Sequence, residues 1–364
     1  MKSWKKLLSL GAITLAAISP SVMVSCNSDS KIKNELDKTK KELESKNKEI
    51  QKLKEERKTL GLLYANAWNT FTADKDNVTL GQYKAAKHAF DKMISQTSIS
   101  PNTDKDGKVQ NPTNGKYIPA VFMDIDDTIL NNFAYQNYLI TNNLTYNPES
   151  WDKFVKSEAS TEVRGAIDFI KYVWSKGGVV MFNSNRNQSN QIQATKNNLK
   201  KIGLDEKYMP DWVWWMKGSD ATKDKPWKET KGKSSKEERM HAFDTKTFDL
   251  SEYGSGNAVK FRTIMKIGDD INDFHDNATK GKSTAEQKEA AKKFEHLMGN
   301  MDINQKGVYF DKKEWKTLDY ATSYVQIGGQ ASYGGWVHSL FKAHNVDTDA
   351  LLELLRKHSW KPTE

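Results

Sequence analysis

The sequence VFMDIDDT, residues 121–128, decides the fold, because an apolar run ends abruptly in three carboxylates and a hydroxyl. A short apolar run of this kind is typical of a parallel strand that is covered on both faces. In open α/β sheets, ligands bind beyond the carboxyl ends of the strands. Asp124 and Asp126 are two residues apart, so a bend at the strand end can turn both carboxylates toward one point. A divalent cation removes their mutual repulsion, and oxygen ligands of this kind suit Mg²⁺.

A second apolar segment, residues 178–182, is predicted to be a strand that also ends in polar groups. The sequence SNR follows it at residues 184–186. A serine after a strand is often a helix N-cap, and a serine that caps a helix can also serve a site. The aromatic run at residues 211–216 is interpreted as a third strand, followed by a long polar loop.

Residues 262–267 are predicted to be a fourth strand, and it delivers a second pair of carboxylates. Gly268 lets the backbone approach a ligand closely. Asp269 and Asp273 are four residues apart on a strand-to-helix turn, so they can face the same site. An aspartate-rich surface turn is the alternative interpretation of residues 121–128, but two pairs of carboxylates after separate strands favour a functional site.

These motifs, in this order, resemble those of the haloacid-dehalogenase-like phosphatases. Within that superfamily they are most similar to the class C bacterial acid phosphatases and the lipoprotein 5'-nucleotidases of bacterial surfaces. The resemblance covers about residues 62–336. It implies an α/β fold with a Rossmann-like parallel sheet and a helical cap or subdomain, and it places the phosphatase domain at residues 61–340.

The resemblance also assigns roles to individual residues. Asp124 is the expected nucleophile and Asp126 the general acid and base of a phosphomonoesterase that works through an aspartyl-phosphate. Ser184 and Lys236 are expected to balance the charge of the transferring phosphoryl group. Lys233 is the alternative to Lys236, because both lie in one lysine-rich segment.

The same family implies a Mg²⁺ cofactor and a small phosphomonoester substrate. The ion is expected to be held by Asp124, the backbone carbonyl of Asp126 and Asp269, with Asp273 in support. The further candidates for substrate binding are Thr128, Asn185, Arg186 and Tyr333.

Aromatic residues flank the motifs where a leaving group could lie. By resemblance, this family can hold a nucleobase between aromatic side chains, so nucleoside monophosphates are the expected substrates. Phe133, Tyr135, Trp151 and Tyr333 are the candidates, and core packing is the alternative role for each of them. Tyr333 is favoured because its Tyr-Gly-Gly-Trp context is similar to the C-terminal motif of the family.

The N-terminal segment, residues 1–26, is predicted to be a targeting signal. Lys2, Lys5 and Lys6 precede an apolar run, and Cys26 is the only cysteine of the chain. The segment resembles a bacterial lipoprotein signal, in which the cysteine is lipidated. This predicts a protein anchored through Cys26 to the cell membrane on its extracellular face. A cleaved signal with an incidental cysteine and an uncleaved helix are the alternatives.

Residues 27–60 are predicted to form a charged helical stalk. Leu36, Leu43 and Ile50 fall seven residues apart, and the other seam position holds Ile32, Leu53 and Leu60, but Thr39, Lys46 and Arg57 interrupt the pattern. A single solvated helix and a coiled coil are therefore both consistent with the pattern. Oligomerisation through this stalk is a further expectation.

The net charge of +9 arises from lysines spread along the chain. No specific nucleic-acid partner is expected, because the lysines form no single patch, and the charge instead favours steering of phosphorylated substrates. Two regions depart from the family pattern: an insertion at residues 244–257 and a C-terminal tail at residues 341–364, predicted to contain a short amphipathic helix.

Two other functions fit the same residues. One is a lipid-anchored surface binding protein built on a catalytically decayed phosphatase fold, for which the stalk, the basic charge and the insertion argue. The other is a different reaction on the same scaffold, such as phosphonate cleavage or phosphoryl transfer, in which Asp124 would keep its role.

Overall fold

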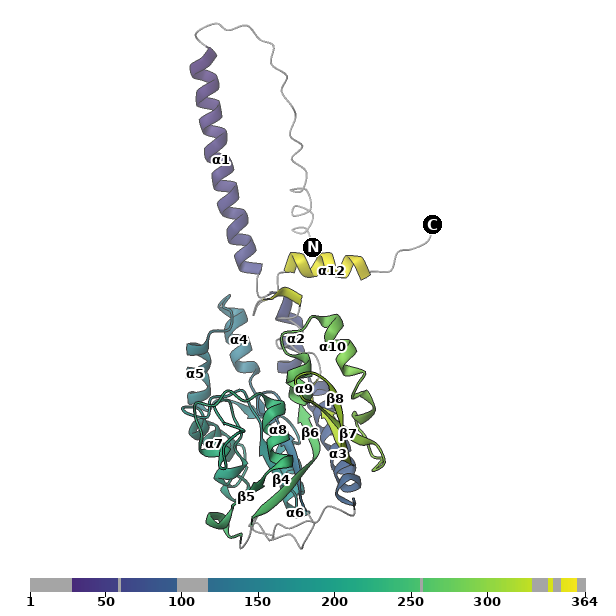
Figure 1. Ribbon diagram of the computed structural model, residues 1–364. Helices are drawn as coiled ribbons and strands as arrows, with labels where there is room; N and C mark the ends of the chain where they lie inside the picture. Colours follow the sequence, from purple (N-terminus) through teal and green to yellow (C-terminus); the bar gives the residue numbers. More distant parts are fainter. Residues whose placement is uncertain are drawn as a thin grey trace. The chain divides into compact units, whose positions relative to one another are not determined.

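Three of the predicted strands pair side by side in a five-stranded sheet (Figure 1). In this computed structural model, β1 (Ile118–Met123) pairs in parallel with β4 (Val179–Phe182) on one side and with β6 (Val259–Gly268) on the other. Every residue of β1 and β4 is buried, as their continuous apolar sequences predict. The carboxyl ends of the three strands therefore meet at one edge of the sheet.

β6 pairs with two shorter strands on its other side. β9 (Ser323–Gln326) runs parallel to residues 265–268 of β6, and β5 (Thr247–Phe248) runs antiparallel to residues 259 and 260. The insertion expected at residues 244–257 thus contributes an antiparallel strand at the edge of the sheet. Mixed sheets of this kind are common among doubly wound folds.

Amphipathic helices pack on the sheet. α3 (Ala73–Ile94) and α6 (Ala166–Ser175) contact each other, α6 contacts β4, and α3 contacts β6. α8 (Lys236–Thr245) packs on β6 and on α9 (Asn272–Thr279) (Figure 1). α3, α6 and α8 carry apolar side chains into one core with the strands.

A small helical subdomain lies between β1 and α6 in the sequence. α4 (Phe133–Thr141) and α5 (Pro148–Ser157) form its helices. The short strands β2 (Leu130–Asn131) and β3 (Thr161–Glu162) pair in antiparallel fashion and close its base. This part of the chain corresponds to the predicted helical cap.

Further elements complete the unit that follows the stalk. They are α2 (Leu63–Phe71), α7 (Ile192–Lys201), α10 (Thr284–Ala291) and the antiparallel pair β7 (Lys306–Phe310) and β8 (Trp315–Ala321). The hairpin of β7 and β8 contributes Trp315, which packs against a second small core that includes Phe274, Phe294 and Tyr324.

The prediction of a strand at residues 211–216 is wrong. The chain there forms a single 3-10 turn, Asp211–Val213, and meets the sheet through one bridge between Phe182 and Trp214. Trp212, Trp214 and Trp215 are nevertheless fully buried. The indole N–H of Trp215 donates to the carbonyl of Trp212 (2.9 Å), which satisfies a polar group without a strand ladder. An apolar run indicates burial, and here only Trp214 has an extended backbone beside β4 while residues 211–213 form the 3-10 turn.

The structure describes residues 28–57, 60–96, 117–255, 258–328, 340–342 and 348–358. The chain divides into two units, Met1–Glu55 and Glu56–Glu364. α1 (Ser28–Arg57) is the charged helix expected for the stalk, and α12 (Thr348–His358) is the helix expected in the tail. None of the helices in these ranges is both long enough and apolar enough to cross a membrane.

Candidate active site

Three aspartates converge where β1 and β6 end. Asp124 directly follows β1, and its backbone N–H donates to the carbonyl of Ile267 on β6 (2.9 Å). Asp269 directly follows β6, and Asp273 lies in the first turn of α9. One carboxylate oxygen of each aspartate lies within 4.8 Å of those of the other two. Three oxygen donors at this spacing fit a divalent cation such as Mg²⁺.

Gly268, the last residue of β6, allows Asp273 to reach this cluster. A Cβ atom at position 268 would overlap the Asp273 carboxylate, so a larger residue would displace the first turn of α9. The close approach predicted for Gly268 is therefore an approach to the side chain of Asp273. The backbone N–H of Asp270 also donates to Asp273 (3.0 Å), which fixes this carboxylate in the turn.

Burial gives the aspartates unusual acidities. It raises the pKa of the Asp124 carboxyl to about 7, against the opposing effect of the Lys236 ammonium. The pKa of Asp269 is raised well above its usual range by burial and then by the charges of Asp273 and Asp124. A cation bound between these carboxylates favours their ionised forms, so metal binding at this site must displace protons.

Lys236 supplies the positive charge of the site. Its ammonium lies 2.5 Å from Asp124 and 2.7 Å from Asp273, and its side chain is 3% exposed. Burial alone lowers the pKa of this lysine, but the two carboxylates raise it, so the side chain stays charged. Lys233, the alternative from the sequence, is exposed. The structure therefore places Lys236, and not Lys233, beside Asp124.

The first turn of α8 holds Lys236 in place. Ser235 is the N-cap and forms a reciprocal capping box with Glu238. The carboxylate of Asp276, on α9, accepts the backbone N–H groups of Lys236 (2.7 Å) and Glu237 (2.9 Å). These contacts fix α8 to the helix that carries Asp273. No local pattern singles out Asp276, because its partners lie about forty residues away in the chain.

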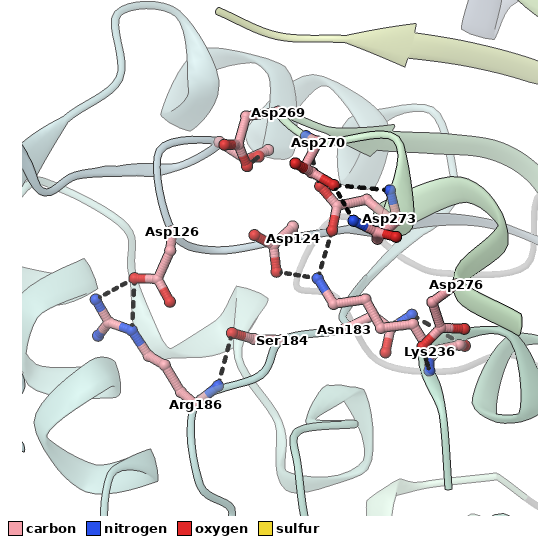
Figure 2. A network of polar contacts seen from close by, with 12 residues as sticks. Asp124, Asp126, Asn183, Ser184, Arg186, Lys236, Asp269, Asp270, Asp273 and Asp276 are labelled. Carbon is pink, nitrogen blue, oxygen red and sulfur yellow. Dashed lines mark hydrogen bonds and ion pairs between the residues drawn. The ribbon is translucent and has the colours of Figure 1, made fainter. Parts of the chain in front are cut away.

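Asp126 lies on the opposite side of Asp124 from Lys236 (Figure 2). The guanidinium of Arg186 donates to its Oδ1 atom from Nε (2.9 Å) and from Nη2 (2.7 Å). The side-chain amide of Asn132 donates to the same oxygen (2.7 Å). Asp126 is therefore held through one oxygen, and its side chain is 19% exposed. Asn132 was not predicted as a site residue, and only the folded loop after β1 brings it there.

Ser184 and Asn185 follow β4, as expected. Figure 2 shows Ser184 near Asp124, on the side away from Asp269. The Ser184 hydroxyl is buried and accepts the backbone N–H of Arg186 (3.1 Å). Asn185 lines the cavity beside the aspartates.

Thr128 and Arg186, both predicted to bind substrate, have buried side chains that contact protein groups instead. The Thr128 hydroxyl donates to Asp269 (3.3 Å), and Arg186 is paired with Asp126 and Thr195. Neither residue lines the cavity. In the structure they therefore position two of the aspartates.

The cavity above the aspartates has a volume of about 280 Å³. Asp124, Asp126 and Lys236 lie at its base, and Tyr135, Tyr146 and Trp151 of the helical subdomain form an aromatic wall. The rings of Tyr135 and Trp151 meet edge to face at 5.2 Å between their centroids. The predicted aromatics Tyr135 and Trp151 thus reach the site, whereas Phe133 is buried and does not line the cavity.

Two predicted functional residues, Tyr333 and Cys26, lie outside the described residues. Their assignments to the substrate and to a lipid anchor stay predictions.

The match of the chain to a known family agrees with this geometry. The model of the family described as HAD superfamily, subfamily IIIB (Acid phosphatase), matches residues 75–295. The chain belongs to this acid phosphatase family. The family expected from the motifs is thereby confirmed, together with phosphomonoesterase as its class of activity.

Two solved structures of the class C acid phosphatase from Bacillus anthracis, one with tungstate bound, share the fold of this acid phosphatase. They superpose with TM-scores of 0.54 and 0.55 at 20% sequence identity, covering 84% of this chain and 99% of theirs. The predicted haloacid-dehalogenase-like α/β fold is confirmed by this likeness.

Proposed function

We propose that this acid phosphatase hydrolyses nucleoside monophosphates through an aspartyl-phosphate on Asp124, with Mg²⁺ as its cofactor. The observation that most supports this proposal is the meeting of Asp124, Asp269, Asp273 and Lys236 at the carboxyl edge of one sheet. Carboxylates and a lysine so arranged surround a nucleophile with the charges that phosphoryl transfer requires.

The first step forms the enzyme-bound phosphate. A carboxylate oxygen of Asp124 attacks phosphorus, and the bond between phosphorus and the leaving oxygen breaks. Lys236 and Ser184 stabilise charge on the phosphoryl oxygens, since both lie beside Asp124. Asp126, on the other side of Asp124, gives its proton to the leaving alcohol.

The second step releases inorganic phosphate. Asp126, now ionised, takes a proton from a water molecule, and the oxygen of that water attacks phosphorus. The bond between phosphorus and Asp124 breaks, and the free carboxylate returns. The hydrogen bonds of Arg186 and Asn132 to a single oxygen of Asp126 leave its other oxygen available for these transfers.

Asp124, Asp269 and Asp273, with the backbone carbonyl of Asp126, are the groups that would hold Mg²⁺. When bound, the ion neutralises charge on the phosphoryl group and polarises its oxygens.

Removal of the nucleophile tests the activity. We expect para-nitrophenyl phosphate to be hydrolysed by the wild type in Mg²⁺ and not after treatment with a chelator. Asp124→Asn should lose turnover while remaining folded, because a neutral amide is a poor nucleophile. Undiminished hydrolysis by Asp124→Asn would exclude the assigned nucleophile. A wild type that binds Mg²⁺ but releases no product would favour the alternative of a decayed enzyme.

The nucleotide preference is supported by the aromatic wall of the cavity. Stacking on an aromatic ring tolerates any base and contributes about 1–3 kcal/mol per base, which corresponds to about 5- to 150-fold in affinity. We therefore expect kcat/KM to be higher for nucleoside 5'-monophosphates than for glycerol phosphate, without sharp selectivity for one base.

Three tyrosine variants locate the stacking ring. Tyr146→Ala tests the wall that the structure shows, and Tyr333→Ala tests the residue expected from the family motif. Tyr64→Ala is the control, because Tyr64 is 84% exposed on α2 and does not line the cavity. The ratio of kcat/KM for a nucleotide to that for glycerol phosphate should fall in at least one test variant and not in the control. Equal values of kcat/KM for the nucleotide and for glycerol phosphate in the wild type would favour a general acid phosphatase.

We also propose that the enzyme acts at the outer face of the cell membrane, anchored by lipid on Cys26. The targeting segment and the position of the only cysteine support this. A single acyl chain binds membranes only weakly, so stable attachment requires more than one chain on this residue. Cys26→Ser protein should leave the detergent phase on phase separation. Quantitative retention of the variant in that phase would mean that the anchor is another group.

A further inference from the structure

Helix α1 carries an exposed apolar seam. Every residue from 30 to 54 is exposed. Ile32, Leu36, Leu43, Ile50 and Leu53 keep between 45% and 60% of their exposure. Isolated helices gain little stability from propensity alone, and most helical stability in proteins comes from packing of an apolar face. A long helix with an unpacked seam is therefore incomplete by itself.

The seam residues occupy the two core positions of a heptad. Leu36, Leu43 and Ile50 fall at position a, and Ile32 and Leu53 fall at position d of the same frame. Thr39 and Lys46 occupy the remaining d positions; polar residues in a seam fix the register of a coiled coil at some cost in stability. The spacing matches the seven-residue repeat of a left-handed coiled coil.

The charges beside the seam select the partner and its direction. In this frame, position g is glutamate at Glu35, Glu42 and Glu49, and position e is Lys33, Lys40, Asn47 and Lys54. In a parallel pair, each g residue faces the e residue five positions later on the other helix. Glu35 then meets Lys40 of the second copy, and Glu49 meets Lys54 of the second copy. An antiparallel pair would instead place glutamates against glutamates and lysines against lysines.

Lys46 favours two helices over a larger bundle. Its ammonium lies 3.1 Å from Glu49 of the same helix, so its charge is already turned toward the edge of the seam. In a two-stranded coiled coil that edge is open to water, and a lysine there can extend its charged end outward. In a larger bundle the same position lies deeper in the core, where a charge is costly.

We propose that α1 is one strand of a parallel, in-register, two-stranded coiled coil, and that its partner is a second copy of this chain. The helices then begin side by side. If Cys26 is lipidated as proposed above, the dimer brings two lipid anchors to the same end, two residues before α1. Two anchors hold a protein on a membrane more stably than one. The pairing itself does not depend on lipidation.

Cysteine cross-linking tests the direction of the helices. The full chain with Cys26→Ser has no cysteine, so single cysteines can be introduced and oxidised in mild detergent. Leu36→Cys and Ile50→Cys lie at position a near opposite ends of the helix, and Lys41→Cys and Lys48→Cys are matched controls at the outward position f. A parallel, in-register pair predicts efficient cross-linking of both seam variants and of neither control.

The alternatives give different patterns. An antiparallel pair brings at most one of the two seam positions next to its own copy, so cross-linking of only one variant overturns the proposal. A cross-link between Leu36→Cys and Ile50→Cys in a mixture, without cross-links within each variant, overturns it in the same way. A monomeric mass for the uncross-linked chain by sedimentation equilibrium, or the mass of a trimer or tetramer, overturns the two-stranded assignment.

Charge reversal tests the pairing independently. Combined Glu35→Lys, Glu42→Lys and Glu49→Lys should raise the dissociation constant of the dimer by at least about tenfold, because it replaces attraction with repulsion at the Glu35–Lys40 and Glu49–Lys54 pairs. Adding Lys33→Glu, Lys40→Glu and Lys54→Glu should restore it. Unchanged phosphatase activity shows that each variant is folded. An unchanged dissociation constant after the three glutamate substitutions contradicts the proposed pairing.

Discussion

Replacement of Lys236 by methionine separates the role of its charge from that of its length. The Lys236 ammonium is buried between Asp124 and Asp273, at 2.5 Å and 2.7 Å. Methionine fills a similar space without the charge, so two carboxylates are left without their cation. Loss of one partner of a buried ion pair costs about 3–5 kcal/mol. With an unfolding entropy of about 2.1 cal/mol/K per residue and a domain of about 300 residues, this predicts a Tm lower by about 5–8 °C.

The measurement is a thermal melt in chelator at pH 8, where the carboxylates that lose their partner are most strongly ionised. The loss should be smaller at pH 5, because burial already favours the protonated form of Asp124. Turnover of an aryl phosphate in Mg²⁺ should fall by about 10²–10³, the usual effect of removing one group that stabilises transition-state charge. Lys233→Met is the matched control, and this exposed residue should change stability by less than about 0.5 kcal/mol. A stable and active Lys236→Met, or an inactive Lys233→Met, would show that the charge of Lys236 does not have the role assigned to it.

Three further predictions concern the groups around Lys236. Asp126→Asn should slow an alkyl phosphate by about 10²–10⁴ and an activated aryl phosphate far less, because only the poor leaving group needs a proton; equal losses would argue against a general acid. Asp276→Ala removes the acceptor for the first turn of α8, so it should cost about 1 kcal/mol of stability and lower kcat more than it raises KM; unchanged kcat would leave Asp276 without a positioning role. Burial raises the pKa of Asp124 to about 7, above the value of about 3.9 expected in the unfolded chain. The folded state therefore binds more protons between these values, and stability falls as pH rises through that range. The metal-free enzyme should melt at a higher temperature at pH 5 than at pH 7.5, and Mg²⁺ should raise Tm more at pH 7.5; the opposite order for both would contradict protonation of the cluster.

The sequence was sufficient for the strands and aspartates whose signals are local. β1 and β6 each combine an apolar run with carboxylates directly after it, and parallel strands must bring their carboxyl ends to one edge. Asp124, Asp269 and Asp273 therefore meet as predicted. The insertion at residues 244–257 could be recognised only as a departure from the family pattern, and its edge strand β5 carries just two residues.

Other features depend on contacts between distant residues. Resemblance to the family favoured Lys236 and left Lys233 as the alternative, and the position of α8 brings Lys236 to Asp124. Asp276 and Asn132 position site residues through hydrogen bonds that the sequence next to them does not predict. The aromatic run at residues 211–216 shows a different limit, because its tryptophans are buried but residues 211–213 form a 3-10 turn where a continuous strand was predicted. Apolar periodicity in a short run does not separate a strand from another buried conformation.

In the proposed mechanism, Asp124 carries the phosphoryl group between the two steps of the reaction. Its most direct test is to quench turnover of a ³²P-labelled phosphomonoester with acid and to map the label on the digested chain by mass spectrometry. We predict one acid-stable phosphoryl group on Asp124, which disappears in a chase with unlabelled substrate and does not form in Asp124→Asn. Label on another residue, or full hydrolysis with no phosphoenzyme at any time before the first turnover is complete, would contradict the account.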